Sequence, residues 1–193
     1  MEPAFSYPHY LLKRQVLALT GIVRIYNSQG EMVLYSRQRM FRLKEDIRVY
    51  RDEGMTQEVL HIRARQVLDF SAAYDVVEST SGIKVGALRR RGWQSLARDE
   101  WQILNPNDEV IGTLQEDSLG RALLRRFLLG TWLPQHYVAA LGTHPVAEYR
   151  QRFHLFRYEM EIDFSADPAQ QFDRRLGLAA AILLAIIEGK QSS

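Results

Sequence analysis

Arginines at alternate positions are the residues of this sequence with the clearest potential for binding chemistry. Arg63 and Arg65 form one such pair, Arg89 and Arg91 form another, and Arg90 lies between the last two. Residues two apart in a strand point to the same side, so each pair presents two guanidinium groups on one face, while Arg90 points away from its neighbours. Guanidinium groups bind phosphate and carboxylate through paired hydrogen bonds. These five arginines are the predicted binding residues, and a phosphate-bearing anion is their predicted ligand.

A solvated surface of balanced charge is the alternative interpretation of the same arginines. Glu58, Asp75 and Glu78 lie in neighbouring segments and can pair with them. All but four of the 25 cationic residues are Arg, and such a bias also follows from the base composition of a genome. Both interpretations place the arginines on an outer wall.

Catalytic chemistry has no comparable signal. The sequence contains no G-x-S-x-G, P-loop, G-x-G-x-x-G or H-E-x-x-H motif, and its five histidines lack helical metal-ligand spacing. It has no Cys, which excludes disulfides, thiol catalysis, Cys-ligated zinc and palmitoylation. We therefore predict a protein that is not an enzyme, with no catalytic residue, no metal and no cofactor.

The elements that must position the arginines are short strands. Polar turns at Gly30, Gly54, Gly82 and Asp108 separate segments in which apolar and polar residues alternate. The predicted strands are Tyr10–Val16, Thr20–Tyr26, Glu31–Arg37, Ile47–Tyr50, Gln57–Arg65, Phe70–Glu78, Ile83–Arg90, Glu100–Leu104, Glu109–Gln115, Tyr137–Gly142, Val146–Arg152 and Phe153–Phe164. This series predicts a mainly β (β+α) fold, an antiparallel barrel of about twelve strands formed by residues 1–193 as a single domain.

A fully apolar segment near the end of the sequence explains why the sheet should close. Leu176–Ile187 has no polar side chain, and a helix that is apolar on every side must be buried on every side. A barrel wrapped around it is the simplest container. Asp167 as N-cap, Pro168 at the first helical position and Gly189 after the end predict a central helix over about residues 168–188.

The apolar segment is too short for a membrane span. It covers about 18 Å as a helix, against roughly 30 Å of bilayer hydrocarbon. Gly177, Ala181 and Ala185 form a stripe of small residues, which suits helix pairing in lipid or close approach to a barrel wall. Met1–Tyr10 lacks the features of a signal peptide. We predict no transmembrane span and a cytoplasmic location, with any association with a membrane being peripheral.

A second helix is predicted between Ser118 and Gly130. Its apolar face includes Leu123 and Phe127, and Arg121 and Arg125 lie on the opposite face. Such a helix can lie on an anionic membrane or cover one mouth of the barrel. We predict that it caps the barrel.

Several short motifs resemble a known family. They are Tyr10-Leu-Leu-Lys-Arg, the turn at Gly30, Val85-Gly86-Ala-Leu-Arg-Arg, Ser95 with Arg98-Asp99-Glu-Trp101, Ile111-Gly112 and the closing apolar helix. In this order they resemble the LURP-one-related and phospholipid-scramblase-like group of the tubby C-terminal-like superfamily. The resemblance implies a twelve-stranded barrel threaded by the C-terminal helix.

The resemblance also implies binding at membranes. Tubby-type barrels bind phosphoinositide headgroups, and scramblase-like members act at membranes with calcium. Here Asp163, Asp167 and Asp173 precede the helix without the alternating oxygen ligands of a calcium loop. The palmitoylated cysteines and Pro-rich segment of animal scramblases are also absent, which argues against active scrambling.

The predicted function is therefore a non-enzymatic barrel that binds an anionic ligand, in particular a phospholipid or phosphoinositide headgroup. The alternative is a protein-interaction scaffold that holds a protein partner. Nucleic acid is disfavoured because the net charge is only +2.

Overall fold

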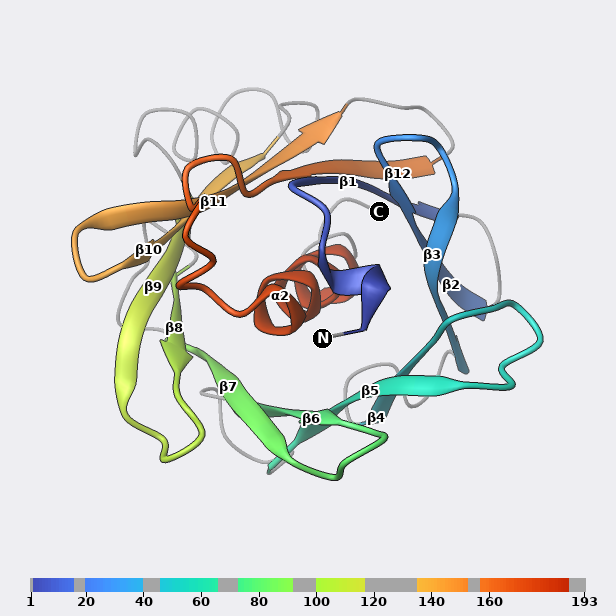
Figure 1. The fold of residues 1–193 in the computed structure, drawn as a ribbon, viewed down its shortest axis with the longest axis horizontal. Coiled ribbons are helices and arrows are strands. Elements are labelled where there is room, and N and C mark those ends of the chain that lie inside the picture. The colour runs from blue at the N-terminus through green and yellow to red at the C-terminus, as the bar shows by residue number, and fades with distance from the viewer. Residues whose placement is uncertain are drawn as a thin grey trace, which may run out of the picture.

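Twelve antiparallel strands form a closed barrel in the computed structural model, which describes residues 2–15, 20–39, 46–65, 73–91, 100–116, 135–152 and 157–187. Each strand lies beside its neighbour in the chain, and the first strand pairs with the last to close the ring (Figure 1). The predicted fold class is confirmed. The strands are β1 (His9–Gln15), β2 (Thr20–Asn27), β3 (Met32–Arg39), β4 (Asp46–Tyr50), β5 (Glu58–Ala64), β6 (Ala73–Glu78), β7 (Lys84–Arg90), β8 (Glu100–Leu104), β9 (Val110–Glu116), β10 (His136–Leu141), β11 (His144–Arg152) and β12 (Arg157–Asp163).

The alternation of apolar and polar residues decides which side of each strand faces inward. In β5, Leu60 and Ile62 point inward and are fully buried, whereas Arg63 points outward and is exposed. The same period of two runs along β12, where Tyr158 and Met160 are buried. The inner face is therefore apolar and the outer face carries the charges.

Two turns on opposite sides of the ring share one hydrogen-bond pattern. Asn27 and Asn105 each use the side-chain oxygen to accept the N–H groups two and four residues later. The side-chain amide of each then donates to a glutamate, Glu31 at 2.8 Å or Glu109 at 2.6 Å. This side-chain turn fixes the β2–β3 and β8–β9 hairpins, so a single Asn largely determines each of them.

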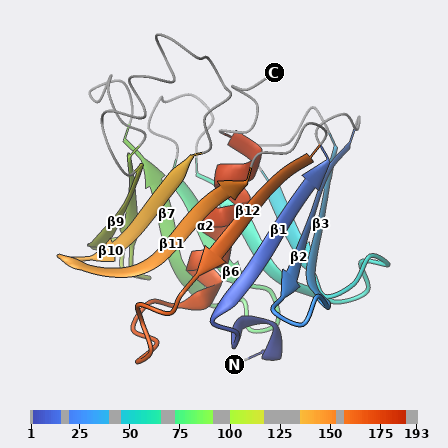
Figure 2. The same ribbon diagram turned by 90° about the horizontal axis from the view of Figure 1, so that it is seen from above.

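The C-terminal helix α2 (Arg174–Ile187) lies inside the barrel (Figure 2). All of its residues except Arg175 are buried. The helix packs closely where glycines stand: a Cβ at Gly86 would lie 2.9 Å from Leu176 Cδ1, and one at Gly177 would lie 2.5 Å from the ring of Phe164. Tyr149 donates its hydroxyl to the carbonyl of Gly177 at 3.1 Å. The small residues of the helix thus serve packing within the barrel.

The start of the helix differs from the prediction. Helix α2 begins at Arg174, not at Pro168, and Asp173 is its cap, because its carboxylate accepts the N–H of Arg175 at 2.9 Å. Asp167 instead accepts the N–H groups of Gln171 and Phe172, each at 2.9 Å. The Asp-Pro pair therefore organises the loop before the helix and not its first turn.

A buried ion pair closes this end of the barrel. Arg174 Nη1 lies 3.0 Å from Asp167 Oδ2, and the guanidinium stacks 4.4 Å from the ring centroid of Phe164. A short 3₁₀ helix, η1 (Pro3–Phe5), lies across the same end. The hydroxyl of Tyr10 donates to the carbonyl of Ala4, and burial raises the pKa of Tyr10 to about 12.

Some predicted features fall outside the described residues. These are the helix between Ser118 and Gly130, the Ser95 and Arg98-Asp99 motifs, and the first part of the predicted strand Phe153–Phe164. Within the described ranges, no helix combines the length and the apolarity needed to cross a membrane.

Candidate functional site

Helix α2 fills the interior of the barrel, so ligand-binding residues must be sought on the outer wall. Two charged surfaces among the described residues lie on different sides of the ring. One consists of the arginines predicted from the sequence, on β5 to β7. The other is a groove over β2, β1, β12 and β11, which the sequence did not indicate.

The first surface, here called the arginine wall, brings four of the five predicted residues together. Arg63 is opposite Asp75 in the register, and Ala73 is opposite Arg89. The N–H of Arg65 donates to the carbonyl of Ala73 at 2.9 Å. Arg65 and Arg89 therefore lie on either side of Ala73, whose side chain is small. Arg91 follows Arg89 on the same outer face.

Arg65 belongs to a network of opposite charges. Its guanidinium lies 2.7 Å from Asp75 and also contacts Asp108, in the β8–β9 turn. Lys84 Nζ lies 2.6 Å from the same Asp108 oxygen and 3.3 Å from Asp75. The hydrogen bond to Asp75, then that to Asp108, raises the pKa of Arg65, and the pKa of Asp108 is lowered by Lys84 and Arg65. Two cations and two carboxylates thus neutralise this part of the wall.

The other arginines of the wall are less compensated. Arg89 donates two hydrogen bonds, of 2.9 and 2.6 Å, to the neutral side-chain oxygen of Gln102. Arg63 is exposed, with Asp46 and Asp75 opposite it on the two neighbouring strands. Among the described residues, however, no carboxylate lies within ion-pair distance of Arg63 or Arg89. Arg91 pairs with Glu100 at 3.0 Å.

Arg90 is the predicted residue that the structure sets apart. It is opposite the buried Trp101 and acts electrostatically on the buried Tyr74, so it falls on the inward-facing side of β7. The acidic partners also differ from those expected. Asp75 pairs with Arg65, but Glu58 pairs with Arg48 and Glu78 with Arg175 of the helix.

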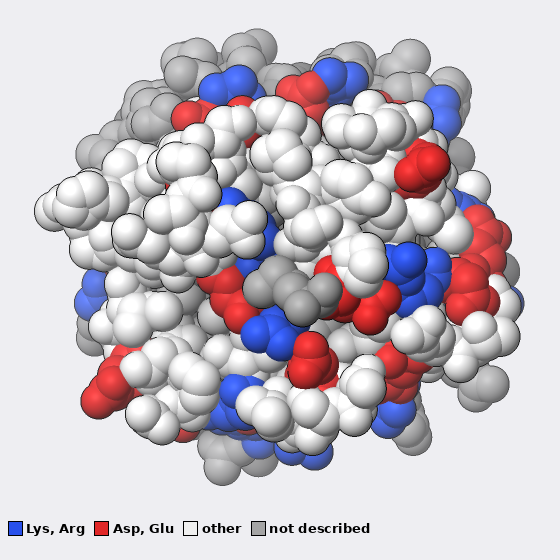
Figure 3. Space-filling view, viewed as in Figure 1, with Lys and Arg blue, Asp and Glu red and all other residues white. Residues whose placement is uncertain are grey.

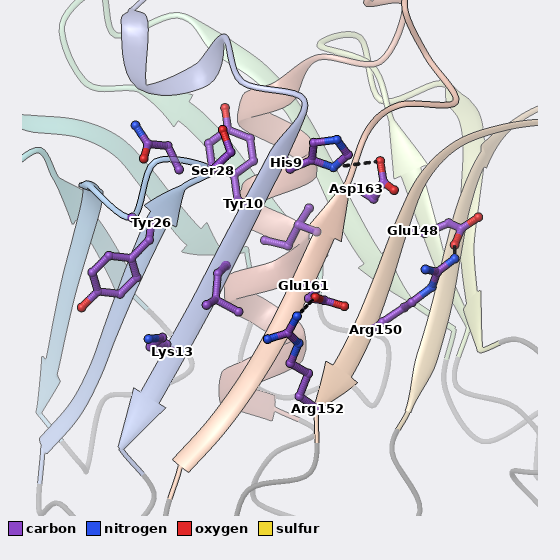
Figure 4. Close-up of a pocket in the computed structure, with 14 residues that line it drawn as sticks. His9, Tyr10, Lys13, Tyr26, Ser28, Glu148, Arg150, Arg152, Glu161 and Asp163 are labelled. Carbon is purple, nitrogen blue, oxygen red and sulfur yellow. Dashed lines mark hydrogen bonds and ion pairs between the residues drawn. The ribbon is translucent and has the colours of Figure 1, made fainter.

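The second surface, here called the charged groove, has a volume of about 610 Å³. Its lining comes from β2, the β2–β3 turn, β1, β12 and β11, as Figure 4 shows. Three ion pairs lie along β1, β11 and β12: Arg152 with Glu161, Arg150 with Glu148, and His9 with Asp163 at 3.3 Å. The side chains of these pairs are between one-third and three-fifths exposed.

Lys13 is the cation of the groove that forms no ion pair with a described carboxylate, although Glu159 is opposite it on β12. Its Nζ lies 5.1 Å from the ring centroid of Tyr26, and no described carboxylate lies within ion-pair distance.

Burial acts to raise the pKa of Asp163, but hydrogen bonds from Ser165 and the charges of His9 and Arg150 outweigh it and leave that pKa lowered. The sequence shows the alternating charges along β12, but it does not show which strands lie beside β12. The charged groove could therefore not be predicted from it.

Acidic and basic side chains also alternate at the end of the barrel where α2 begins, where Figure 3 shows Lys and Arg beside Asp and Glu. The three aspartates before the helix follow this rule. Asp163, Asp167 and Asp173 are each matched by a different partner, His9, Arg174 and Arg175. In the described part of the chain, no group of three or more acidic or histidine side chains is placed to hold a metal ion.

These observations define a class of protein: a closed twelve-stranded β-barrel threaded by the apolar helix that follows its last strand. The LURP-one-related family model matches residues 32–185, so the chain belongs to the LURP-one-related family. This confirms the family predicted from the motifs, while the wider tubby-like grouping stays a prediction. No curated protein and no solved structure matches the chain.

Proposed function

We propose that the protein is a non-enzymatic barrel that binds an anionic, phosphorylated headgroup at the arginine wall. The observation that carries this proposal is the position of Arg63 and Arg89, which flank Arg65 and have no described carboxylate partner. A phosphate bound here would meet guanidinium groups that form no ion pair with a described carboxylate.

The spacing of the wall suits a phosphate. Arg65 and Arg89 are two strands apart, which places their Cα atoms about 10 Å from each other, within reach of two arginines converging on one anion. Ala73 between them leaves the space over β6 open to the ligand. Cations also outnumber carboxylates on this wall. Five cations, Arg63, Arg65, Lys84, Arg89 and Arg91, face four carboxylates, Asp46, Asp75, Glu100 and Asp108.

Co-sedimentation with vesicles tests the proposal. Vesicles of phosphatidylcholine alone are compared with vesicles that also contain a phosphoinositide. We expect retention only on the second, and expect Arg63→Glu/Arg89→Glu to weaken it at least tenfold, because two attractive charges become repulsive. Retention should also fall as salt is raised.

The matched control is Arg150→Glu/Arg152→Glu, the same change of charge in the charged groove, on a different side of the barrel. We expect it to leave phosphoinositide retention within about twofold. Equal retention on neutral vesicles, or an equal loss in both double variants, would refute headgroup binding at the arginine wall.

A further inference from the structure

The charged groove is a second site with a different charge pattern. On its β1–β2 side lie Lys13, the hydroxyl group of Tyr26 and the hydroxyl of Ser28. On its β12–β11 side lie the carboxylates of Glu161, Asp163 and Glu148, each beside its own cation (Figure 4). The groove therefore offers a cation that forms no ion pair with a described carboxylate, with hydroxyl groups beside it, at one side and several carboxylates at the other.

Backbone pairing decides how a ligand can be recognised there. Strand β1 pairs with β2 and β12, and β12 pairs with β1 and β11, so the backbone groups of these strands are already used within the sheet. A closed ring has no free edge to which an extended peptide can add as a strand. Recognition must come from side chains, which favours a small charged ligand that fits about 610 Å³.

The register places the cation Lys13 and the carboxylate of Glu161 close enough for one small ligand to contact both. Leu11 is opposite both Tyr26 and Glu161, and Lys13 is two residues further along β1. Neighbouring strands are about 4.8 Å apart, so the hydroxyl of Tyr26 and the carboxylate of Glu161 stand on either side of the apolar Leu11. A simple anion held at Lys13 would be repelled by Glu159, which is opposite Lys13, and by Glu161. A ligand that also carries an ammonium group turns the repulsion from Glu161 into attraction.

We propose that the charged groove binds a zwitterion with a phosphate and a primary ammonium, the phosphoethanolamine class. The phosphate contacts Lys13 and the hydroxyl group of Tyr26, and the ammonium donates to Glu161. The Arg152–Glu161 pair is about half exposed, at 54% and 41%, so opening it costs little. When this pair opens, Glu161 gains the ammonium, and Arg152 can turn to Glu159, which is opposite it in the register.

Four soluble probes test the proposal with the full chain: phosphoethanolamine, glycerol 3-phosphate, ethanolamine and phosphocholine. Each is titrated while backbone amide shifts are followed by NMR. We expect phosphoethanolamine to bind at least tenfold more tightly than glycerol 3-phosphate or ethanolamine, each of which carries charge of one sign only. The shifts should fall on β1, β2 and β12. Phosphocholine should bind less tightly than phosphoethanolamine, because its quaternary ammonium has no N–H to donate.

Two variants separate the two charges. Lys13→Gln should weaken phosphoethanolamine and glycerol 3-phosphate alike. Glu161→Gln should reduce phosphoethanolamine to the affinity of glycerol 3-phosphate without weakening the latter. Arg63→Glu, on the arginine wall, is the control and should leave the shifts on β1, β2 and β12 unchanged with both probes. Both test positions are on the outer wall, and a thermal unfolding curve for each variant confirms that it is folded.

Equal affinity for phosphoethanolamine and glycerol 3-phosphate would overturn the proposal, since it would mean a simple anion site. So would the absence of binding, or shifts confined to β5 to β7. A vesicle arm then assigns the source of the ligand: retention on phosphatidylethanolamine in phosphatidylcholine indicates the lipid headgroup, and binding of the soluble probe alone indicates the free compound. Because the site differs from the arginine wall, either proposal can fail while the other stands.

Discussion

Ion pairs inside the barrel and on its outer wall are built differently. Asp167 and Arg174 are 4% and 5% exposed, and both are held by further hydrogen bonds to the backbone. Arg152 and Glu161 on the outer wall are about half exposed. A buried pair has one geometry, because any other arrangement leaves a charge without a partner. An exposed pair can change partners, which makes the outer wall the side suited to ligands.

Removing one partner of the buried pair should have the largest effect. Arg174→Met leaves the Asp167 carboxylate buried without its cation, and we expect the free energy of unfolding to fall by about 3–5 kcal/mol. The measurement is urea unfolding followed by circular dichroism. The matched outer variant is Arg91→Met, which removes an exposed pair with Glu100 and should cost about 0–1 kcal/mol.

If both variants cost the same, the contrast between the two faces is wrong. A double variant sharpens the test. Asp167→Asn/Arg174→Met removes both charges, so it should recover part of the stability that Arg174→Met loses, because no isolated charge remains inside.

Replacing an isoleucine by alanine inside the barrel and on its outer face should give the next largest difference in stability. Ile182 in α2 is fully buried, and Ile182→Ala should cost about 2–5 kcal/mol through lost contacts and the cavity left behind. Ile83 is 65% exposed, and Ile83→Ala should change stability by no more than about 0.5 kcal/mol. Thermal and urea unfolding measure both. A small cost at Ile182 would mean that α2 is not packed inside the sheet.

The smallest expected effect is on the loss of stability at acidic pH. Lys84 and Arg65 lower the pKa of Asp108 in the folded protein below its ordinary value of 3.8. The unfolded state then binds more protons than the folded state between these two values, so stability is present above about pH 4 and is lost as the pH falls below it. We expect Asp108→Asn to reduce the fall in melting temperature between pH 5 and pH 3. An unchanged slope would show that the outer network does not hold this charge.

The inner face was largely predictable and the outer face was not. Alternation in β5 and the apolar run of α2 depend on burial, which acts on each segment separately. The helix start was missed because Asp167-Pro168 has the composition of a cap, while its carboxylate is used by Gln171, Phe172 and Arg174. Local sequence cannot distinguish these two uses.

The charged groove depends on pairings that no local pattern specifies. His9 and Ser165, which lie side by side at its rim, are 156 residues apart in the chain. The Arg63, Arg65, Arg89 and Arg91 set was visible because β5, β6 and β7 are consecutive strands that lie side by side. The partner of Arg65 in the β8–β9 turn, Asp108, was not predicted from its position in the sequence.

The position of α2 at the centre of the barrel also has a consequence for synthesis. The helix follows every strand in the chain, and β1 must wait for β12 to close the ring. A nascent chain therefore exposes the apolar inner faces of its strands until the residues of α2 have left the ribosome. Such late, long-range contacts slow folding, and the incomplete sheet is a natural client for chaperones.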